Sequence, residues 1–439
     1  MNKQVRIISV IAVVMIVALM FSTTQLQFTF SKELQANGHN TRQIYKTYNQ
    51  PRGAIKIAGK KIAYSEKTSD AYGYQRYYVD SPIYSPITGF FSIANRADRG
   101  IEAAMNDELN GDSSVSVFTN IKDFILNKPK QGLDVNLTIS EAAQKAAMSA
   151  LDGKIGAAVA IEPSTGKILA LASTPTIDAN LFAVHDTGKA SKAYSDAANT
   201  EGGDETSPLI NRAISTVYPP GSTMKIVTSA AALETGDYTE KTLIDAPIKY
   251  RLPGTDHDIT NVVTNCWASN GKETMKLALT VSCNTAFAML GQKLGNKKME
   301  AQAKKFGFEE RFILAGQNSG FPMIAANSGF PKNATDTRLP MDSIGQGDTA
   351  ISVLQDALLS SAVANKGVLM SPYIVDSLSD DGGVVSKNKS KTFGKVMSSD
   401  SADQIKDMME SVVTTEISGA RISGVKVAGK SGTAQNDPN

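Results

Sequence analysis

The first clear pattern of hydrophobic and polar positions lies near the N-terminus. Ile7 to Phe21 are apolar except for Ser9. Two basic residues, Lys3 and Arg6, precede this run, and no acidic residue occurs before Glu33. A basic segment followed by an apolar run is typical of a membrane insertion signal.

The apolar run is shorter than the roughly 20 residues that span a bilayer, so a spanning helix needs partly interfacial residues from Ser22 to Phe28. A cleaved signal peptide is the alternative, but no small-x-small cleavage pattern follows Phe21. Basic residues, Lys32 and Arg42 among them, also follow the run, so the positive-inside rule only weakly favours a cytoplasmic N-terminus. We expect an uncleaved, single-pass anchor.

Beyond this segment the pattern divides the chain in two. From Thr41 to about Leu137 it is polar and tyrosine-rich, with a strand-like piece at Gln75–Val79 and a helical stretch at Arg96–Leu109. A second pattern opens at Thr138. The sequence therefore predicts a cytoplasmic tip and anchor at 1–28, a spacer or pedestal domain at 29–137, and a larger domain at 138–439.

The larger domain has an α+β pattern. A helix is expected from Ser140 to Ala150, followed by strands at Gly156–Ile161 and Ile168–Ser173, which a hairpin turn joins. The polar segment from His185 to Ser207 is expected to be a surface loop. Apolar residues at helical spacing over Thr349–Asn365 predict a helix that faces a core.

The amino-acid composition restricts the kinds of reaction and partner that the chain is expected to have. A chain of 439 residues with 41% apolar residues, 20% charged residues and a formal charge of +2 has room for two or three domains and shows no preference for nucleic acid. The chain has three histidines, His39, His185 and His257, and none has metal-ligand spacing. The sequence therefore gives little support to a metal site or to a serine-histidine triad. Cys266 and Cys283 form either one disulfide or two small buried thiols.

The stretch YPPGSTMKIVTSAAALE contains the strongest candidate for catalysis. A Pro-Pro-Gly sequence precedes Ser222, and a run with strong helix content follows it. At a helix N-terminus the helix dipole favours developing negative charge, and Lys225 falls one turn on, on the same face. This is the arrangement of a nucleophile and its base, provided that burial beside another cation lowers the pKa of the lysine.

The S-x-x-K pattern alone is weak, because three other pairs match it. One lies in a hairpin turn, the second in the solvated run SKNKSK, and the third in a strand-like segment where the two side chains would point to opposite faces. These pairs are Ser164 with Lys167, Ser386 with Lys389, and Ser423 with Lys426. Only Ser222 opens a helix.

Two further motifs follow in order. In LTVSCNTAFAMLG, Ser282 and Asn284 flank Cys283 at the start of an apolar helix. In GVKVAGKSGTAQ, Lys430 supplies the second cation at the end of a short Val-rich strand, where Gly432 lets a substrate backbone approach closely. With no basic residue beside it, Cys283 is a packing residue or half of a bridge rather than a nucleophile.

These three motifs together resemble the penicillin-recognising acyl-serine enzymes. Within that family the chain resembles a class B penicillin-binding protein, a monofunctional peptidoglycan D,D-transpeptidase. Stretches across the chain carry the resemblance: RGAI, GIEAAMNDELNG, GAAVAIEPSTGKILALAS, PLINRAISTVYPPGSTMKIVT and SIGQGDTAISVLQDALLSSAVANKG. The resemblance implies a pedestal followed by a central antiparallel sheet flanked by helices.

The resemblance also implies a role for each motif residue. Ser222 would be acylated by the penultimate D-alanine of a stem peptide, with Lys225 as general base, Ser282 as proton relay and Lys430 as a source of positive potential. Substrate contacts would come from the following residues: Asn284 for the donor amide, Ser431 and Thr433 for its carboxylate, Gly432 for close approach, and the N–H groups of Ser222 and Thr433 for the oxyanion.

The expected partners are peptidoglycan stem peptides, β-lactams, the cell membrane and a membrane-embedded glycan polymerase, with the catalytic domain outside the cytoplasm and no cofactor, metal or nucleic acid. A D,D-carboxypeptidase is the main rival. A β-lactamase and a non-catalytic penicillin sensor or scaffold fit less well. In the resembling family further strands and a helix follow the K-[ST]-G strand, so a chain ending at Asn439 is expected to be a fragment or to have an unusual end.

Overall fold

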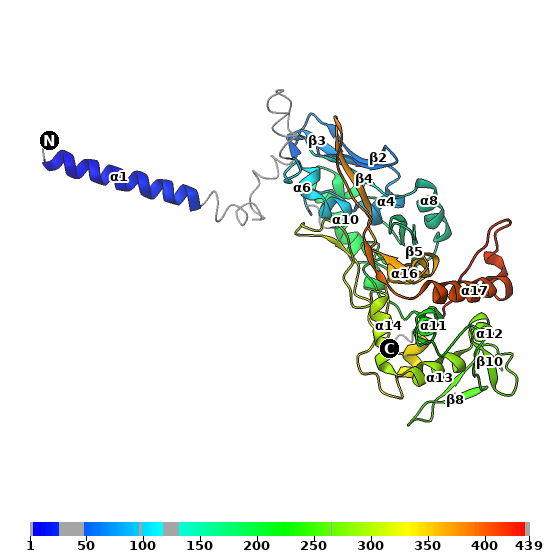
Figure 1. Ribbon diagram of the computed structural model, residues 1–439. Coiled ribbons are helices and arrows are strands. Elements are labelled where there is room, and N and C mark those ends of the chain that lie inside the picture. The colour runs from blue at the N-terminus through cyan, green and yellow to red at the C-terminus, as the bar shows by residue number, and fades with distance from the viewer. Residues whose placement is uncertain (1–2, 26–47, 96–98, 117–130, 265, 435–439) are drawn as a thin grey trace.

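The computed structural model describes residues 3–25, 48–95, 99–116, 131–264 and 266–434 (Figure 1). Its first helix, α1 (Lys3–Thr24), has 22 residues, none of them buried. At 1.5 Å per residue α1 is about 33 Å long, which is sufficient to cross the hydrocarbon core of a bilayer. The helix contains the expected apolar run and is long and apolar enough to span a membrane. Residues 26–28 of the expected anchor lie outside the described residues.

The expected spacer region forms strands and short helices. In chain order they are β1 (Ile55–Ile57), β2 (Lys60–Lys67), β3 (Tyr74–Tyr78), α4 (Ser81–Thr88), α5 (Gly100–Ala104), α6 (Asn106–Leu109) and β4 (Asp134–Leu137). The expected strand at Gln75–Val79 is β3, displaced by one residue. The expected helix at Arg96–Leu109 is two short helices, α5 and α6, separated at Met105, and its residues 96–98 lie outside the described part.

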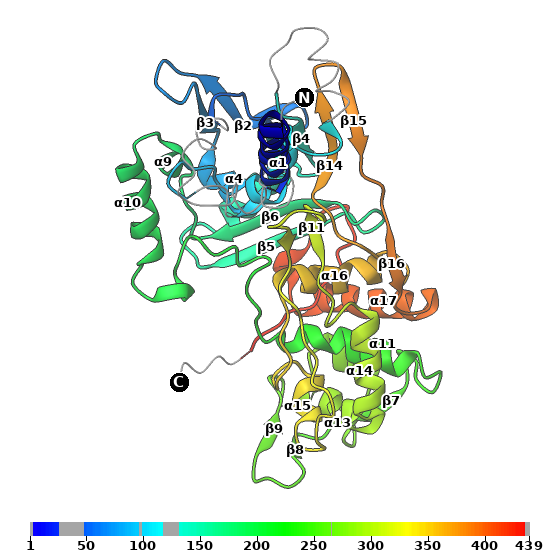
Figure 2. The same cartoon turned by 90° about the vertical axis from the view of Figure 1, so that its left-hand side faces the viewer.

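Strands from far along the chain complete the sheet of this region. β4 pairs in parallel with β1 and antiparallel with β14 (Val375–Asp380), which in turn pairs with β15 (Gly383–Lys387). The strand order is β15-β14-β4-β1-β2-β3, and Figure 2 shows the β14–β15 hairpin rising on the far side of the sheet from β3. The expected boundary at residue 137 therefore divides the sequence but not the sheet.

A buried ion-pair cluster joins α5 to this sheet. The carboxylate of Glu102 has no exposure and accepts from Nε of Arg52 at 2.6 Å and Nε of Arg76 at 2.7 Å. The hydroxyl of Tyr78 donates to the same carboxylate at 3.0 Å. Arg52 also donates to Oδ1 of Asn110 at 2.5 Å. The cluster thus fixes α5, the end of α6, strand β3 and the segment before β1 relative to one another.

The remaining elements run from residue 141 to residue 420. They are α8 (Glu141–Ala150), β5 (Gly156–Ile161), β6 (Ile168–Thr174), α9 (Asn180–Ala183), α10 (Thr187–Ala198), η2 (Gly203–Glu205), η3 (Gly221–Met224), α11 (Lys225–Leu233), β7 (Leu243–Asp245), β8 (Lys249–Arg251), β9 (Asp258–Thr260), β10 (Lys272–Thr274), α12 (Met275–Thr280), α13 (Asn284–Leu294), α14 (Asn296–Lys305), β11 (Ile313–Ala315), β12 (Met323–Ile324), α15 (Leu339–Ser343), α16 (Val353–Ala364), β13 (Val368–Met370), β16 (Thr392–Lys395), α17 (Ser399–Thr415) and η4 (Ser418–Ala420). The expected hairpin is confirmed, because β5 and β6 pair antiparallel.

The segment from His185 to Ser207 is not a loop throughout, so that expectation was wrong. Most of it is helix α10, which Asp186 caps by accepting from the backbone N–H of Lys189. Several alanines in this stretch favour a helix, and one of them, Ala190, is buried. The loop was predicted from the many polar residues of the segment, although its alanines favour a helix.

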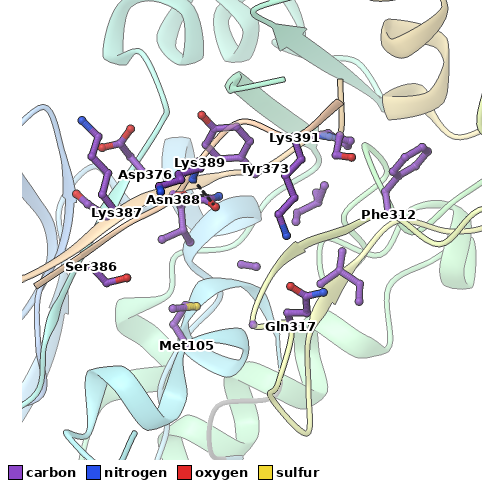
Figure 3. A pocket seen from close by; sticks show the side chains of 18 of the residues that line it. Met105, Phe312, Gln317, Tyr373, Asp376, Ser386, Lys387, Asn388, Lys389 and Lys391 are labelled. Atoms are coloured by element: carbon purple, nitrogen blue, oxygen red, sulfur yellow. Dashed lines mark hydrogen bonds between the residues drawn. The ribbon is translucent and has the colours of Figure 1, made fainter. Parts of the chain in front are cut away.

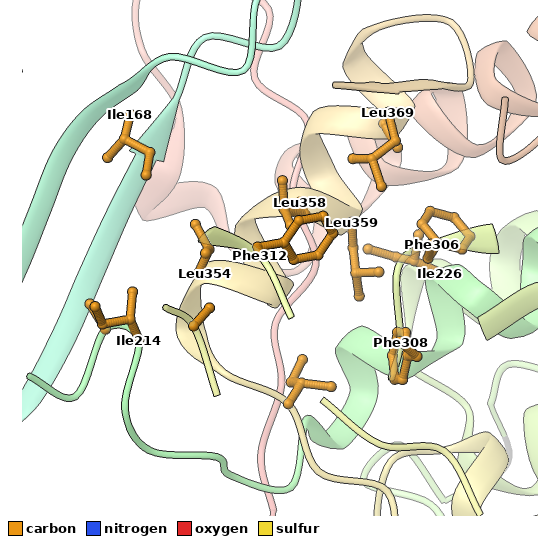
Figure 4. Packing of buried hydrophobic residues seen from close by; sticks show 14 of the residues in the cluster. Ile168, Ile214, Ile226, Phe306, Phe308, Phe312, Leu354, Leu358, Leu359 and Leu369 are labelled. Atoms are coloured by element: carbon orange, nitrogen blue, oxygen red, sulfur yellow. The ribbon is translucent and has the colours of Figure 1, made fainter. Parts of the chain in front are cut away.

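Helix α16 connects the β5–β6 hairpin to the helices below it. Its residues Leu354, Leu358 and Leu359 have no exposure, and they lie between Ile168 on β6 and Ile226 on α11 (Figure 4). The helix begins after Ser352, which accepts from the N–H of Gln355 at its N-terminus. The expected core-facing helix is therefore confirmed, and it packs between the β5–β6 hairpin and α11.

Replacing Glu102 by Gln should lower the free energy of unfolding by about 3–5 kcal/mol, because two buried guanidinium groups lose their counter-charge. Urea unfolding followed by circular dichroism measures this. Glu141→Gln is the control, because its carboxylate pairs with Lys60 at the surface and should matter little. Equal stabilities of the two variants would contradict a structural role for the buried cluster.

Candidate active site

Ser222 lies at the start of a helical segment, as expected, but its first turn is a 3-10 helix. This turn, η3, leads directly into α11. Ser222 is half-buried, whereas every residue of α11 is buried. The hydroxyl is therefore presented by the end of a core helix, a rigid position of the kind that catalysis needs.

The side chain of Lys225 is completely buried. Its Nζ donates to Oδ1 of Asn284 at 2.7 Å, to the carbonyl of Ser282 at 2.8 Å and to Oγ of Ser282 at 3.2 Å. Its Nζ also lies 5.8 Å from the centre of the Phe287 ring. Burial and, secondly, the charge of Lys430 hold the pKa of Lys225 well below its ordinary value.

The turn between α12 and α13 brings Ser282 and Asn284 to the same ammonium group. Ser282 has a φ of 55°, in the left-handed region that non-glycine residues rarely adopt. Asn284, the first residue of α13, also donates from Nδ2 to the carbonyl of Thr260 at 3.0 Å. Both ends of the Asn284 amide are therefore held in place.

Cys283, between these two residues, is joined to Cys266 by a disulfide with a Cα–Cα distance of 5.5 Å. Both cysteines are fully buried. The bond ties the Ser282–Asn284 turn to the segment between β9 and β10. Nearby, Oδ1 of Asn261 accepts from the N–H of Thr285 at 2.9 Å, which adds a second link between the same two segments.

Lys430 places a second cation at this turn. Its Nζ donates to Oγ of Ser282 at 3.0 Å and to its neighbour, the carbonyl of Ser431, at 2.8 Å. Burial lowers the pKa of Lys430 to about 8. The hydroxyl of Ser282 consequently lies between two ammonium groups.

The expected strand around Lys430 does not form in the described residues. Residues 426–434 have no strand assignment, and no described strand pairs with them. The segment is held instead by single contacts, one of which is the bond from the N–H of Gly429 to the carbonyl of Met409 at 3.2 Å. A strand requires a ladder of bonds to a neighbour, so extended sequence alone was insufficient.

Two glycines, Gly221 and Gly432, allow the 426–434 segment to pack closely against the turn that contains Ser222. A Cβ atom on Gly221 would lie 2.5 Å from the carbonyl oxygen of Thr433, and one on Gly432 would lie 2.7 Å from that of Pro220. Neither position has room for a side chain. The group that approaches Gly432 within the protein is the carbonyl of Pro220.

Sequence reasoning missed the loop between α15 and α16 as part of the site. The carbonyl of Gly345 accepts from the N–H of Gly221 at 2.9 Å, and Nε2 of Gln346 donates to the carbonyl of Thr433 at 3.3 Å. The stretch SIGQGDT contributed only to a family resemblance. Gln346 and Thr433 are 87 positions apart, so no local pattern signals their contact.

A cleft of about 510 Å³ lies elsewhere, between β11 and the segment that joins β15 to β16 (Figure 3). Its lining includes Lys387, Lys389, Lys391 and Phe312, and in Figure 3 Lys391 extends into it. None of the expected site residues lines this cleft.

The arrangement at Ser222 is suited to acyl transfer. It combines a hydroxyl at a helix start, a buried lysine of lowered pKa one turn away, and a second hydroxyl between two ammonium groups. Within the described chain no hydrogen bond joins Lys225 to Ser222, but catalytic hydrogen bonds often tighten only when substrate is bound. The described residues also contain no group of three His, Cys, Asp or Glu that could hold a metal.

Comparison with known families gives two matches. The penicillin binding protein transpeptidase domain matches residues 156–439, and the penicillin binding protein A dimerisation domain matches residues 52–135. The first of these spans the three motifs around Ser222. The second spans most of the pedestal strands.

Relatives match along nearly the whole chain. The peptidoglycan D,D-transpeptidase PbpA of Mycolicibacterium smegmatis is 35% identical over 442 residues, covering 99% of this chain and 88% of the relative. PbpA of Mycobacterium tuberculosis is 33% identical over 445 residues, with the same coverage. The ceftriaxone acyl-enzyme complex of M. tuberculosis penicillin-binding protein A superposes with a TM-score of 0.83 at 32% identity, covering 90% of this chain and 87% of that one.

Non-reduced peptide mapping should recover Cys266 and Cys283 in one disulfide-linked pair of peptides that separates on reduction. Cys266→Ser should lower the free energy of unfolding by about 3 kcal/mol, because it opens the loop that the bond closes. The double variant Cys266→Ser, Cys283→Ser should be no less stable than the single one. Two free thiols in the native protein would disprove the bond.

Proposed function

The chain belongs to the penicillin-binding protein transpeptidase family, and from this we propose that it cross-links peptidoglycan through an acyl-enzyme on Ser222. In the first step Oγ of Ser222 attacks the carbonyl of the penultimate D-alanine of a donor stem peptide, and the terminal D-alanine leaves. In the second, the amine of a neighbouring stem peptide takes the acyl group and frees Ser222. β-Lactams enter the first step as mimics of the donor.

The observation that supports this proposal most directly is that Lys225 and Lys430 both donate hydrogen bonds to the hydroxyl of Ser282. Neutral Lys225 takes the proton of Ser222 as its Oγ attacks. Lys225 is then protonated, and Ser282, which is bonded to Lys225 and Lys430, donates its own proton to the leaving nitrogen and regains one from Lys225. Lys430 keeps the local potential positive, which favours the neutral form of Lys225 and the negative charge that develops on the substrate.

Substrate contacts follow from the groups around Ser222. The N–H groups of Ser222 and Thr433 form the oxyanion hole, and the close packing of Thr433 on Gly221 supports this pairing. The hydroxyls of Ser431 and Thr433 hold the donor carboxylate. Asn284 holds the donor amide.

The same proposal includes the place of the chain in the cell. The exposed helix α1 is a single-pass anchor, with the catalytic part outside the cytoplasm, where peptidoglycan is cross-linked. Neither matching family is a glycosyltransferase, so a membrane-embedded polymerase supplies the glycan strands and contacts the anchor and pedestal.

A labelled penicillin should form a stable adduct with the full-length chain, located on the peptide that contains Ser222 and absent from Ser222→Ala. Intact mass and peptide mapping measure this. Ser164→Ala, from another S-x-x-K pair, is the control and should be labelled like the wild type. A folded wild-type protein that forms no adduct would rule out the acyl-serine mechanism.

The same preparation separates transfer from hydrolysis. With a stem-peptide donor and an amine acceptor, a transpeptidase yields the cross-linked product, whereas a D,D-carboxypeptidase yields only the shortened donor. Exclusive hydrolysis at saturating acceptor would replace the transpeptidase proposal with the carboxypeptidase one.

Lys430→Met should move the rising limb of the acylation pH profile to higher pH. Lys225 must be neutral to act as a base, and the charge of Lys430 helps to keep its pKa low, so removal of that charge raises the pKa of Lys225. Acylation rates measured with penicillin across pH 5 to about 10 report the shift. Lys426→Met, an exposed lysine of the same segment, should leave the profile unchanged.

A further inference from the structure

The loop that follows α15 folds around one buried carboxylate. Asp342 has no exposure, and its Oδ1 accepts from the N–H of Asp348 at 2.7 Å and from the hydroxyl of Thr349 at 3.4 Å. Oδ2 of Asp342 is buried and has no hydrogen-bond partner in the described chain. A Cβ on Gly347 would lie 2.0 Å from Oδ1, so the backbone of the turn closes directly over the carboxylate.

The outer side of this turn contacts the backbone of Gly221, directly before Ser222, and the backbone of Thr433. Gly345 accepts from the N–H of Gly221 at 2.9 Å, and a Cβ on Gly345 would lie 2.1 Å from the carbonyl oxygen of Gly221. Gln346 donates to the carbonyl of Thr433 at 3.3 Å. One turn therefore touches the residue before the nucleophile and also Thr433, whose N–H is proposed for the oxyanion hole.

We propose that Asp342 is a positioning residue: its carboxylate shapes the Gly345–Asp348 turn, and the turn sets the separation of the Ser222 and Thr433 N–H groups. This inference rests on the proposed acyl-enzyme function. Asp342 touches no substrate and acts through Gly345 and Gln346. Because oxyanion stabilisation depends on donors fixed in advance, a turn that loosens should slow acylation without weakening the initial binding of the β-lactam.

The charge of Asp342 is set by its surroundings. The pKa of Asp342 is raised to about 6, chiefly by burial; the charge of Asp348 adds to this rise and the hydrogen bond from the Asp348 N–H opposes it. Asp348 itself pairs with Arg338 at the surface. On the neighbouring helix α13 the charged residue is Lys293, which lies over the Tyr238 ring. On α11, Lys225 is bonded to the Ser282–Asn284 turn.

The ionised carboxylate is the stronger acceptor, so the turn should be firmest above about pH 6. As the pH falls through that value Asp342 takes up a proton, and its hold on the Asp348 N–H weakens. Asp342→Asn reproduces the uncharged state at every pH with nearly the same shape.

The test is the kinetics of penicillin acylation in the full-length protein, resolved into the apparent dissociation constant and the acylation rate constant. Asp342→Asn should leave the dissociation constant within about twofold and lower the rate constant about 10- to 100-fold at neutral pH. The ratio of wild-type to variant rate constants should rise with pH, with a midpoint near 6. The ratio cancels the titration of Lys225, which both proteins share.

Two further variants keep the test decisive. Gln346→Leu breaks the bond to Thr433 without touching the buried carboxylate and should also lower only the rate constant, even if Asp342→Asn fails to fold. Lys426→Met changes an exposed lysine away from this turn and should behave like the wild type. Wild-type rate constants in both Asp342→Asn and Gln346→Leu would overturn the inference. A wild-type protein that is never acylated would instead refute the proposed function.

Discussion

The catalytic part of the chain depends on one buried ammonium group. Lys225 has no exposure. An ammonium group that leaves water must gain hydrogen-bond acceptors, gain a counter-charge or lose its proton. Its acceptors are the neutral oxygens of Ser282 and Asn284, and no ion pair of the described chain includes Lys225. Neutral acceptors meet its hydrogen-bonding needs without stabilising its charge as a carboxylate would. A lysine in this setting exchanges a proton easily, as a base must.

This requirement explains why the Ser282–Asn284 turn is restrained from several directions. Its first residue adopts a left-handed backbone, which costs energy that the surroundings must supply. The disulfide at Cys283, the bond from Asn284 to Thr260 and the contact of Lys430 with Ser282 all act on these three residues. The turn is thus restrained at each of its three residues, and small shifts in it would move all of the acceptors of Lys225 together.

The sequence predicted those helices, turns and hairpins whose formation depends on residues close together in the chain. The apolar helix α1, the β5–β6 hairpin, the core-facing helix α16 and the helix start at Ser222 each follow from neighbouring residues. Contacts between distant segments were not predictable in this way. The Gln346–Thr433 bond and the absence of a ladder at residues 426–434 both depend on partners far away in sequence, and α10 was missed because polarity was weighed above propensity. The motif residues were found because their chemistry restricts the residue types, even though their meeting is non-local.

The shared sheet has a consequence for the order in which the protein folds. Val135 on β4 pairs with Leu378 on β14, so the pedestal sheet receives its last strands only after most of the chain has been synthesised. A nascent chain that emerges N-terminus first must keep one edge of β4 unpaired throughout that interval, and an open edge invites association with other chains. The pedestal sheet therefore reaches its full set of strands only after residues 375–387 of the catalytic part have been made.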